Sequence, residues 1–135
     1  MMRDDATASD SIRPESLLRS RTNPRNSLDF IVTHSGALGP SGLHVSLRYV
    51  PDKLLVDDQS LAAFFASLAR PEPIAPETVA LAILDELNNE IVPRWVQIAV
   101  TGGNDAGGQP SQTVSVEDRQ PNWENLGILG RLPPL

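Results

Sequence analysis

Few residue types in this sequence could do chemistry, and they are spread along the chain. It contains two histidines, one lysine and no cysteine. Histidine titrates near neutral pH, so His34, at the tip of a predicted hairpin, is a candidate catalytic acid or base; the alternative is an exposed or hydrogen-bonded structural histidine. The absence of cysteine excludes a disulfide, a thiolate metal site and a cysteine nucleophile.

Charged side chains supply the other candidates. Asp57 and Asp58 could act as paired carboxylates, one with a raised pKa, or could cap the helix that follows. Glu77 lies at the predicted start of a second helix, where it could accept hydrogen bonds from a ligand or interact with the helix dipole. Arg94 could bind an acidic ligand group or an interface carboxylate. Asp57 is therefore a candidate catalytic residue, and Glu77 and Arg94 are candidate substrate-binding residues.

The sequence does not favour a metal site or a phosphate site. His34 and His44 are predicted on opposite faces of one hairpin and would not converge, and there is no third histidine. The Gly-rich segment 102–110 lacks the lysine of a phosphate-binding loop and does not open a helix. Lys53 could form a Schiff base, but it is read more simply as a turn residue beside an aspartate. We expect no metal and no cofactor.

Residue periodicity predicts the elements that carry these side chains. Strands are expected at 30–34, 43–49, 95–101 and 113–117, with a turn at 36–42 and two helices in the middle of the chain. The apolar face of the second strand comprises Leu43, Val45, Leu47 and Tyr49. The first helix, capped by Asp58 or Ser60, has an apolar face of Leu61, Phe64, Phe65 and Leu68. The second helix has Pro76 in its first turn, and its apolar face comprises Val79, Ile83, Leu87 and Ile91.

The order strand, strand, helix, helix, strand, strand predicts an α+β fold. Two antiparallel hairpins around a helix pair make a four-stranded antiparallel sheet with both helices on one face. Residues 1–27 lack a sustained period and are expected to form a flexible leader before a domain at 28–118. Residues 119–135 form an apolar tail, which we expect to dock on its own subunit or on a neighbouring one.

Charge and hydropathy limit the partners. The formal net charge is -6, and there is no basic stripe interleaved with aromatic residues, so nucleic acid is not an expected partner. No apolar run approaches the roughly 18 residues needed to cross a bilayer, so no membrane association is expected and a cytoplasmic location is predicted. An arginine-rich, lysine-poor composition is compatible with the expected bacterial biosynthetic protein but is not specific to one.

Two short motifs resemble a known family. The stretch YVPDK at 49–53 leads into a Val-acidic-x-x-Ser-Leu helix start, and Pro93-Arg94-Trp95 opens the third predicted strand. From about residue 23 to residue 118, the chain resembles the 7-cyano-7-deazaguanine reductases (QueF) of the tunnelling-fold (T-fold) superfamily. The resemblance implies a homo-oligomer in which sheets from several subunits form a β-barrel. It also implies pockets at the subunit interfaces, where a glutamate anchors a base-like substrate.

The reductase residues of that family are absent here. In QueF enzymes, a cysteine in a Cys-Pro-x-x-Gly-x-Pro-Asp loop attacks the nitrile to form a thioimide; segment 34–42 offers neither that cysteine nor the aspartate. The family's NADPH-associated motif is partly retained, at Asp57, Ser60 and Phe64. Its two lysine positions read Gln59 and Ala62, and its terminal asparagine reads Arg70. Counting from Val79 places the substrate-anchoring glutamate at Pro76, next to Glu77.

These features predict a QueF-like protein that cannot reduce a nitrile through a thioimide. It would bind a small planar or heterocyclic compound at a subunit interface and transform it by acid/base chemistry without NADPH, as a lyase, cyclase, isomerase or hydrolase. The alternative is a catalytically silent ligand-binding or structural subunit that assembles with itself or with an active partner. Convergence of Glu77, His34 and Asp57 on one interfacial pocket would favour the enzyme. A pocket filled by side chains or by the tail would favour the alternative.

Overall fold

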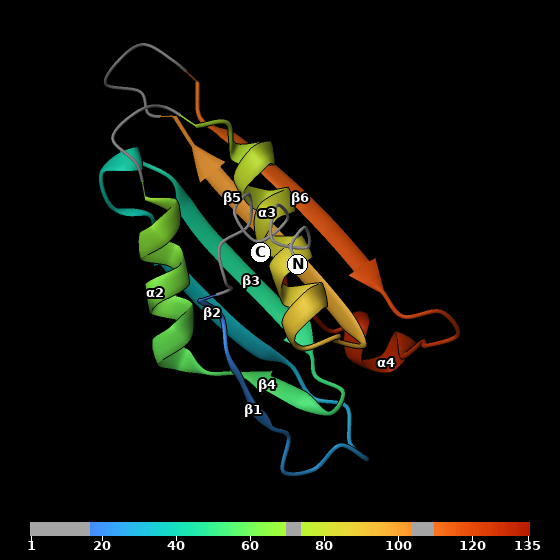
Figure 1. The fold of residues 1–135 in the computed structure, drawn as a ribbon. Coiled ribbons are helices and arrows are strands. Elements are labelled where there is room, and N and C mark those ends of the chain that lie inside the picture. Colours follow the sequence, from blue (N-terminus) through green and yellow to red (C-terminus); the bar gives the residue numbers. More distant parts are fainter. Residues whose placement is uncertain (1–16, 70–73, 104–109) are drawn as a thin grey trace, which may run out of the picture.

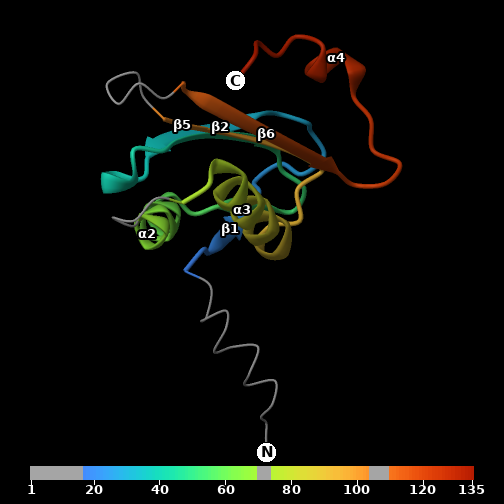
Figure 2. The same ribbon diagram turned by 90° about the horizontal axis from the view of Figure 1, so that it is seen from above.

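A four-stranded antiparallel sheet forms the centre of the fold. The computed structural model describes residues 17–69, 74–103 and 110–135. Within these ranges the strand order of the main sheet is β2-β3-β5-β6. Its strands are β2 (Val32–Ala37), β3 (His44–Val50), β5 (Trp95–Gly102) and β6 (Gln112–Arg119). Helices α2 (Asp58–Leu68) and α3 (Pro76–Glu90) cover one face of this sheet, as Figures 1 and 2 show. The predicted α+β class, with an antiparallel sheet and two major helices, is confirmed.

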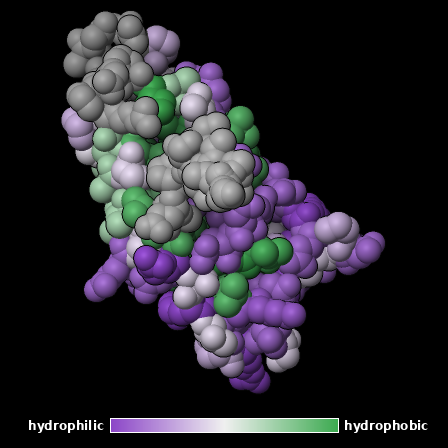
Figure 3. Space-filling model, in the orientation of Figure 1, coloured by the Kyte–Doolittle hydropathy of each residue, from purple (hydrophilic) through white to green (hydrophobic). Residues whose placement is uncertain are grey.

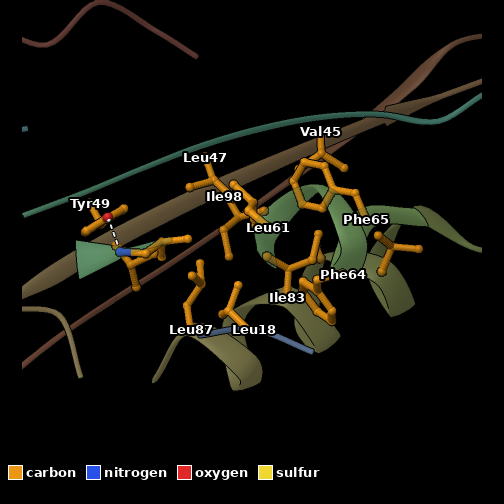
Figure 4. Packing of buried hydrophobic residues seen from close by; sticks show 14 of the residues in the cluster. Leu18, Val45, Leu47, Tyr49, Leu61, Phe64, Phe65, Ile83, Leu87 and Ile98 are labelled. Atoms are coloured by element: carbon orange, nitrogen blue, oxygen red, sulfur yellow. Dashed lines mark hydrogen bonds between the residues drawn. The ribbon is translucent and has the colours of Figure 1, made fainter. Parts of the chain in front are cut away.

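The hydrophobic core lies between the sheet and the two helices. The apolar positions of β3 are paired with apolar positions of β5, as in Leu47 with Ile98 and Tyr49 with Val96. These side chains meet the predicted faces of α2 and α3, which are buried. Figure 4 shows this packing, in which Leu47, Ile83 and Leu87 are fully buried. Alternation in the strand and 3.6-residue periodicity in the helices thus converge on one core.

A second, two-stranded sheet joins the N-terminal segment to the core. It pairs β1 (Ser20–Thr22) with β4 (Leu54–Val56). Leu18, just before β1, is only 2% exposed. The Tyr49 hydroxyl accepts a hydrogen bond of 2.9 Å from the Val56 backbone N–H and so links the two sheets (Figure 4).

The structure corrects the expected start of ordered structure at residue 28. Residues 17–27 of the expected leader contain the buried Leu18 and strand β1. The three residues of β1 are polar and carry no periodic signal, and they are ordered by pairing with β4. Residues 1–16 lie outside the described residues.

Three further expectations differ from the structure in detail. Strand β2 extends to Ala37 instead of ending at His34, because Gly36 and Ala37 continue the pairing with β3. Helix α2 is capped by Asp57, whose side chain accepts a hydrogen bond from the Ser60 backbone N–H, and not by Asp58 or Ser60. Glu86, which lies outside the predicted apolar face of α3, is nevertheless buried, with 8% of its surface exposed.

The C-terminal tail lies on the other face of the sheet. After β6 the chain turns back and forms the short helix α4 (Leu126–Leu129), on the side of the sheet away from α2 and α3 (Figure 2). Asn125 caps α4 by accepting a hydrogen bond from the Ile128 backbone N–H. Both faces of the sheet therefore carry other parts of the same chain.

Val92, between α3 and β5, has a strained backbone. Its φ is 45°, a region that a β-branched side chain rarely adopts, and its side chain is 55% exposed. We expect Val92→Asn to raise the free energy of unfolding by about 1 kcal/mol, because asparagine tolerates this conformation and little packing is lost. Urea unfolding of the two proteins measures the change.

Asn122 supplies the reciprocal control for this prediction. It has a φ of 66° and is already a residue suited to that region. Asn122→Val should therefore destabilise the protein by a similar amount. A Val92→Asn protein no more stable than the wild type would contradict the strain at Val92.

Candidate functional site

A cavity lies between the edge strand β2 and helix α2. Its volume is about 500 Å³. Small and apolar residues predominate in its lining, which comprises His34, Ser35, Gly36, Ala37, Gly39, Asp58, Leu61, Ala62, Phe65, Ala66 and Ala69. Apolar side chains gather along α2 on the face shown in Figure 3. The alanines at the lining positions of α2 leave open the space that longer side chains would fill.

His34 is the histidine of this cavity. It is paired with Leu47 across β2 and β3, so it lies on the apolar face of the sheet, and its ring stacks on Tyr49 with centroids 6.4 Å apart. Its Nε2 atom is buried and has no hydrogen-bond partner among the described residues. Burial lowers the pKa of His34, and Arg21 lowers it further, whereas the negative charge of Asp58 raises it; the net shift is downward. A neutral imidazole at pH 7 can both accept and donate a hydrogen bond.

Two of the candidate carboxylates, Asp57 and Glu77, do not line this cavity. Asp57 holds the first turn of α2 through its hydrogen bond of 3.0 Å from the Ser60 backbone N–H. Glu77 is exposed in the first turn of α3, which packs elsewhere on the sheet. Asp58 lines the cavity instead, because one step along a helix turns the side chain by about 100°. Within one chain, therefore, Glu77, His34 and Asp57 do not line one cavity.

Arg94 is bound by carboxylates of its own chain. Its guanidinium forms ion pairs with Asp29, at 2.8 Å, and with Asp52, at 3.1 Å, and it also donates a hydrogen bond to the Asn26 carbonyl. Asp52 in turn accepts a hydrogen bond of 3.1 Å from Gln120 Nε2. The two short motifs noted in the sequence, at 49–53 and 93–95, thus meet through the pair Asp52–Arg94. This arrangement supports a structural role for Arg94 and not the expected contact with a ligand.

Asp29 attaches the C-terminal tail to this cluster. Its carboxylate accepts hydrogen bonds from Asn125 Nδ2, at 2.9 Å, and Trp123 Nε1, at 3.3 Å, in addition to the Arg94 contact. Burial by itself would raise the pKa of Asp29. The hydrogen bonds from Asn125, Arg94 and Trp123 and the charge of Arg94 outweigh burial, and the pKa is lowered. Sequence reasoning missed Asp29, since a single aspartate before a strand has no distinguishing pattern.

The described residues hold no further site of the classes considered from the sequence. No group of three or more His, Cys, Asp or Glu residues among them could hold a metal ion. Within the same ranges, no helix is long and apolar enough to span a bilayer. The Gly-rich loop at 104–109 lies outside the described residues.

Comparison with known proteins identifies relatives of the chain. Proteins from two strains of Acidithiobacillus ferrooxidans, named NADPH-dependent 7-cyano-7-deazaguanine reductase, are 34% identical to it over 98 residues. A protein of the same name from Syntrophus aciditrophicus is 29% identical over 122 residues, which cover 82% of this chain and 84% of that protein. The chain is thus similar in sequence to proteins named as 7-cyano-7-deazaguanine reductases (QueF). The resemblance seen in the short motifs is thereby confirmed, although no protein-family model matches the sequence.

The extent of the likeness limits what it implies. The match with the Acidithiobacillus proteins covers 70% of the QueF-like chain and 64% of their length. A solved structure, the archaeosine synthase QueF-Like in the apo form, is 17% identical with a TM-score of 0.48, over 67% of this chain and 90% of that one.

Asp29 gives a pH-dependent prediction. Its lowered pKa means that its contribution to stability is fully present above the unfolded value of about 3.8 and is lost as the pH falls through the folded value. We expect Asp29→Asn to lower the free energy of unfolding by about 1 to 2 kcal/mol at pH 7, since hydrogen bonds to a charged group are replaced by weaker ones. Urea midpoints between pH 7 and pH 3 should show the difference shrinking below pH 4. Asp85→Asn, at an exposed position of α3, is the control and should leave the urea midpoint unchanged at both pH 7 and pH 3.

His34 gives a second pH-dependent prediction, for a group that is neutral and not charged above its pKa. Its folded pKa lies below the ordinary histidine value of about 6.5, so the unfolded state binds more protons between the two pKa values. The stability from a neutral His34 is present above about pH 6.5 and is lost as the pH falls through the folded pKa. His34→Gln should flatten the fall in stability between pH 7 and pH 5, whereas His44→Gln, on the exposed face, should retain it. Equal slopes in the two variants would contradict the assignment.

Proposed function

We propose that this QueF-like chain binds a small planar compound in the cavity between β2 and α2 and does not act as a nitrile reductase. The cavity beside His34 is the observation that carries the proposal. Its volume of about 500 Å³ falls within the range of roughly 300 to 1,000 Å³ typical of small-molecule sites. A small-molecule ligand is thus the partner to which the geometry corresponds best.

The chemistry of the lining favours a flat, mostly apolar ligand. Phe65 presents an aromatic ring, and its edge lies 3.6 Å from the position that a Cβ atom on Gly36 would occupy. Strand and helix therefore form two walls, one of backbone and one of small and aromatic side chains. A flat ring can pack against the small side chains of α2 and the edge of Phe65, and His34 and Asp58 supply polar groups that can orient it.

The same proposal excludes the reductase reaction. The resemblance implies a thioimide formed on a cysteine and a hydride from NADPH. The sequence contains no cysteine, and the two lysine positions of the family's cofactor motif are Gln59 and Ala62. No residue of this chain can form the thioimide, and the expected cationic contacts with an anionic dinucleotide are lost.

We further propose that the binding unit is a homo-oligomer that closes a T-fold barrel. Strands β2 and β6 are the edges of the main sheet in the part of the chain that the structure describes. Unpaired edges of similar length invite pairing with another chain, and β2 of one copy can pair with β6 of the next. Because β2 also lines the cavity, such pairing would cover the open rim of the site.

Acid/base catalysis at His34 is the second candidate function. The downward shift of its pKa leaves a neutral imidazole, which is the form that accepts a proton. Asp58, on the same cavity, could stabilise the imidazolium that results. Binding without catalysis ranks first, because Asp57 and Glu77 lie away from the cavity.

Native mass spectrometry of the protein purified from its own host tests the binding proposal. We expect a closed oligomer that releases a stoichiometric heterocyclic compound. Ala66→Trp should fill the cavity and abolish the bound compound without changing the assembly, because Ala66 is exposed at the cavity wall. Ala63→Trp is the matched control and should retain the compound. Ala63 lies three residues before Ala66 on α2, is also exposed and does not line the cavity.

Two outcomes of that experiment contradict the proposal. Equal amounts of the same compound released from the Ala66→Trp and Ala63→Trp proteins would place the ligand elsewhere. A monomeric mass for the wild type would overturn the barrel, and a second protein chain in the assembly would favour a structural subunit.

A further inference from the structure

A second hollow lies on the face of the sheet away from the helices. Its floor is a row across three strands, in which Arg48 of β3 is paired with Gln97 of β5 and Gln97 with Glu117 of β6. Trp95 lies two residues before Gln97 on the same face. The hollow measures about 300 Å³. It is separated from the His34 cavity by the sheet itself.

The C-terminal tail covers this hollow. Leu129, Leu132, Pro133 and Pro134 form the lining opposite the strands. Figure 2 shows the tail running across this face of the sheet. The cover explains why Arg48 is only 6% exposed, although alternation in β3 places it on the polar face. A charged side chain sheltered in this way interacts more strongly with an ion beside it than one in bulk water.

The guanidinium of Arg48 is held in place by one hydrogen bond, and its other donors remain available. Its Nε atom donates a hydrogen bond of 2.8 Å to Gln97 Oε1, and its central carbon lies 6.0 Å from the centroid of the Trp95 ring. Among the described residues, its two terminal nitrogens have no hydrogen-bond acceptor. The end of the guanidinium can therefore donate two parallel hydrogen bonds, which is the geometry that a carboxylate or a phosphate accepts.

The charges around the hollow leave a net positive site. Glu117 is bound from two sides: Trp95 Nε1 donates to it at 2.9 Å, and Arg119 forms an ion pair with it at 3.5 Å. Two arginines and one glutamate sum to +1, in a chain whose formal net charge is -6. Burial lowers the pKa of Arg48 and the charge of Glu117 raises it, but an arginine stays protonated at neutral pH. A buried cation without its own full counter-charge favours an added anion.

We propose that this hollow is a binding site for a small oxyanion, a carboxylate or a phosphate, held end-on by Arg48 beneath the C-terminal tail. Gln97 fixes the orientation of the guanidinium by occupying Nε. The tail lines the side of the hollow opposite the strands and limits the ligand to a small one. This site is independent of the His34 cavity, because it lies on the opposite face of the sheet and shares no lining residue with it.

The two tryptophans allow a direct test by nuclear magnetic resonance. Trp95 lines the hollow, and Trp123, the other tryptophan, lies on the tail at Asp29, so their indole N–H signals report on different places. The full-length protein is titrated separately with succinate and with inorganic phosphate at constant ionic strength. We expect a saturable shift of the Trp95 signal, and the tighter of the two anions identifies the ligand class. The assignment follows from loss of one signal in Trp123→Phe.

Two variants make the test specific to Arg48. Gln97→Glu has almost the same shape and places a carboxylate on the guanidinium, so it should weaken anion binding by about tenfold or more while keeping the fold. Arg131→Gln removes an exposed cation of the tail outside the hollow and should leave the affinity unchanged. The proposal is overturned if Gln97→Glu binds as tightly as the wild type. It is equally overturned if the change in the Trp95 indole N–H signal does not saturate and is the same as the change that chloride causes.

Discussion

The contact between Arg94 and the two aspartates Asp29 and Asp52 holds together parts of the chain that are distant in sequence. Asp29 precedes β2, Asp52 lies in the turn between β3 and β4, and Arg94 opens β5. Backbone hydrogen bonds at the same place join Arg94 N–H to the Val50 carbonyl and Gln120 N–H to the Arg94 carbonyl. Asp29 also binds the C-terminal tail. This cluster therefore positions both the end of the sheet where β5 begins and the tail that lies on the face away from α2 and α3. A partly buried arginine satisfied by two carboxylates can do this where a single neutral hydrogen bond would not.

The two sides of the sheet provide different chemistry because side chains alternate along each strand. On the helix side, β2 directs His34 toward apolar residues, and small side chains on α2 leave a cavity beside it. On the other side, β3 directs Arg48 toward polar residues of β5 and β6, and the tail shields it from water. One side therefore offers a mostly apolar site beside His34 and Asp58, and the other a polar site around the buried Arg48. The helices and the tail determine that difference as much as the strands do.

Several features of the fold and the site could be predicted from the sequence, and the reasons are local. The faces of β3, α2 and α3 follow from regular spacing of apolar residues, and Pro76 marks the start of α3. The position of His34 on the apolar face follows from alternation in a hairpin. The role of Arg94 could not be predicted, because its partners Asp29 and Asp52 are 65 and 42 residues away. The roles of Asp57 and Asp58 could not be distinguished either. The two residues are adjacent, but Asp57 caps α2 and Asp58 lines the cavity.

The sequence by itself determined the class of the fold, the likeness to QueF proteins and the absence of cysteine from this chain. Each of these depends on residue types, on short periods or on the order of elements, which are properties of neighbouring positions. Only the tertiary structure decided that β1 pairs with β4, that Arg94 is bound within its own chain, and that the tail covers Arg48. Those features arise from contacts between distant segments, where pairing, burial and charge compensation depend on how the whole chain packs and not on any local pattern.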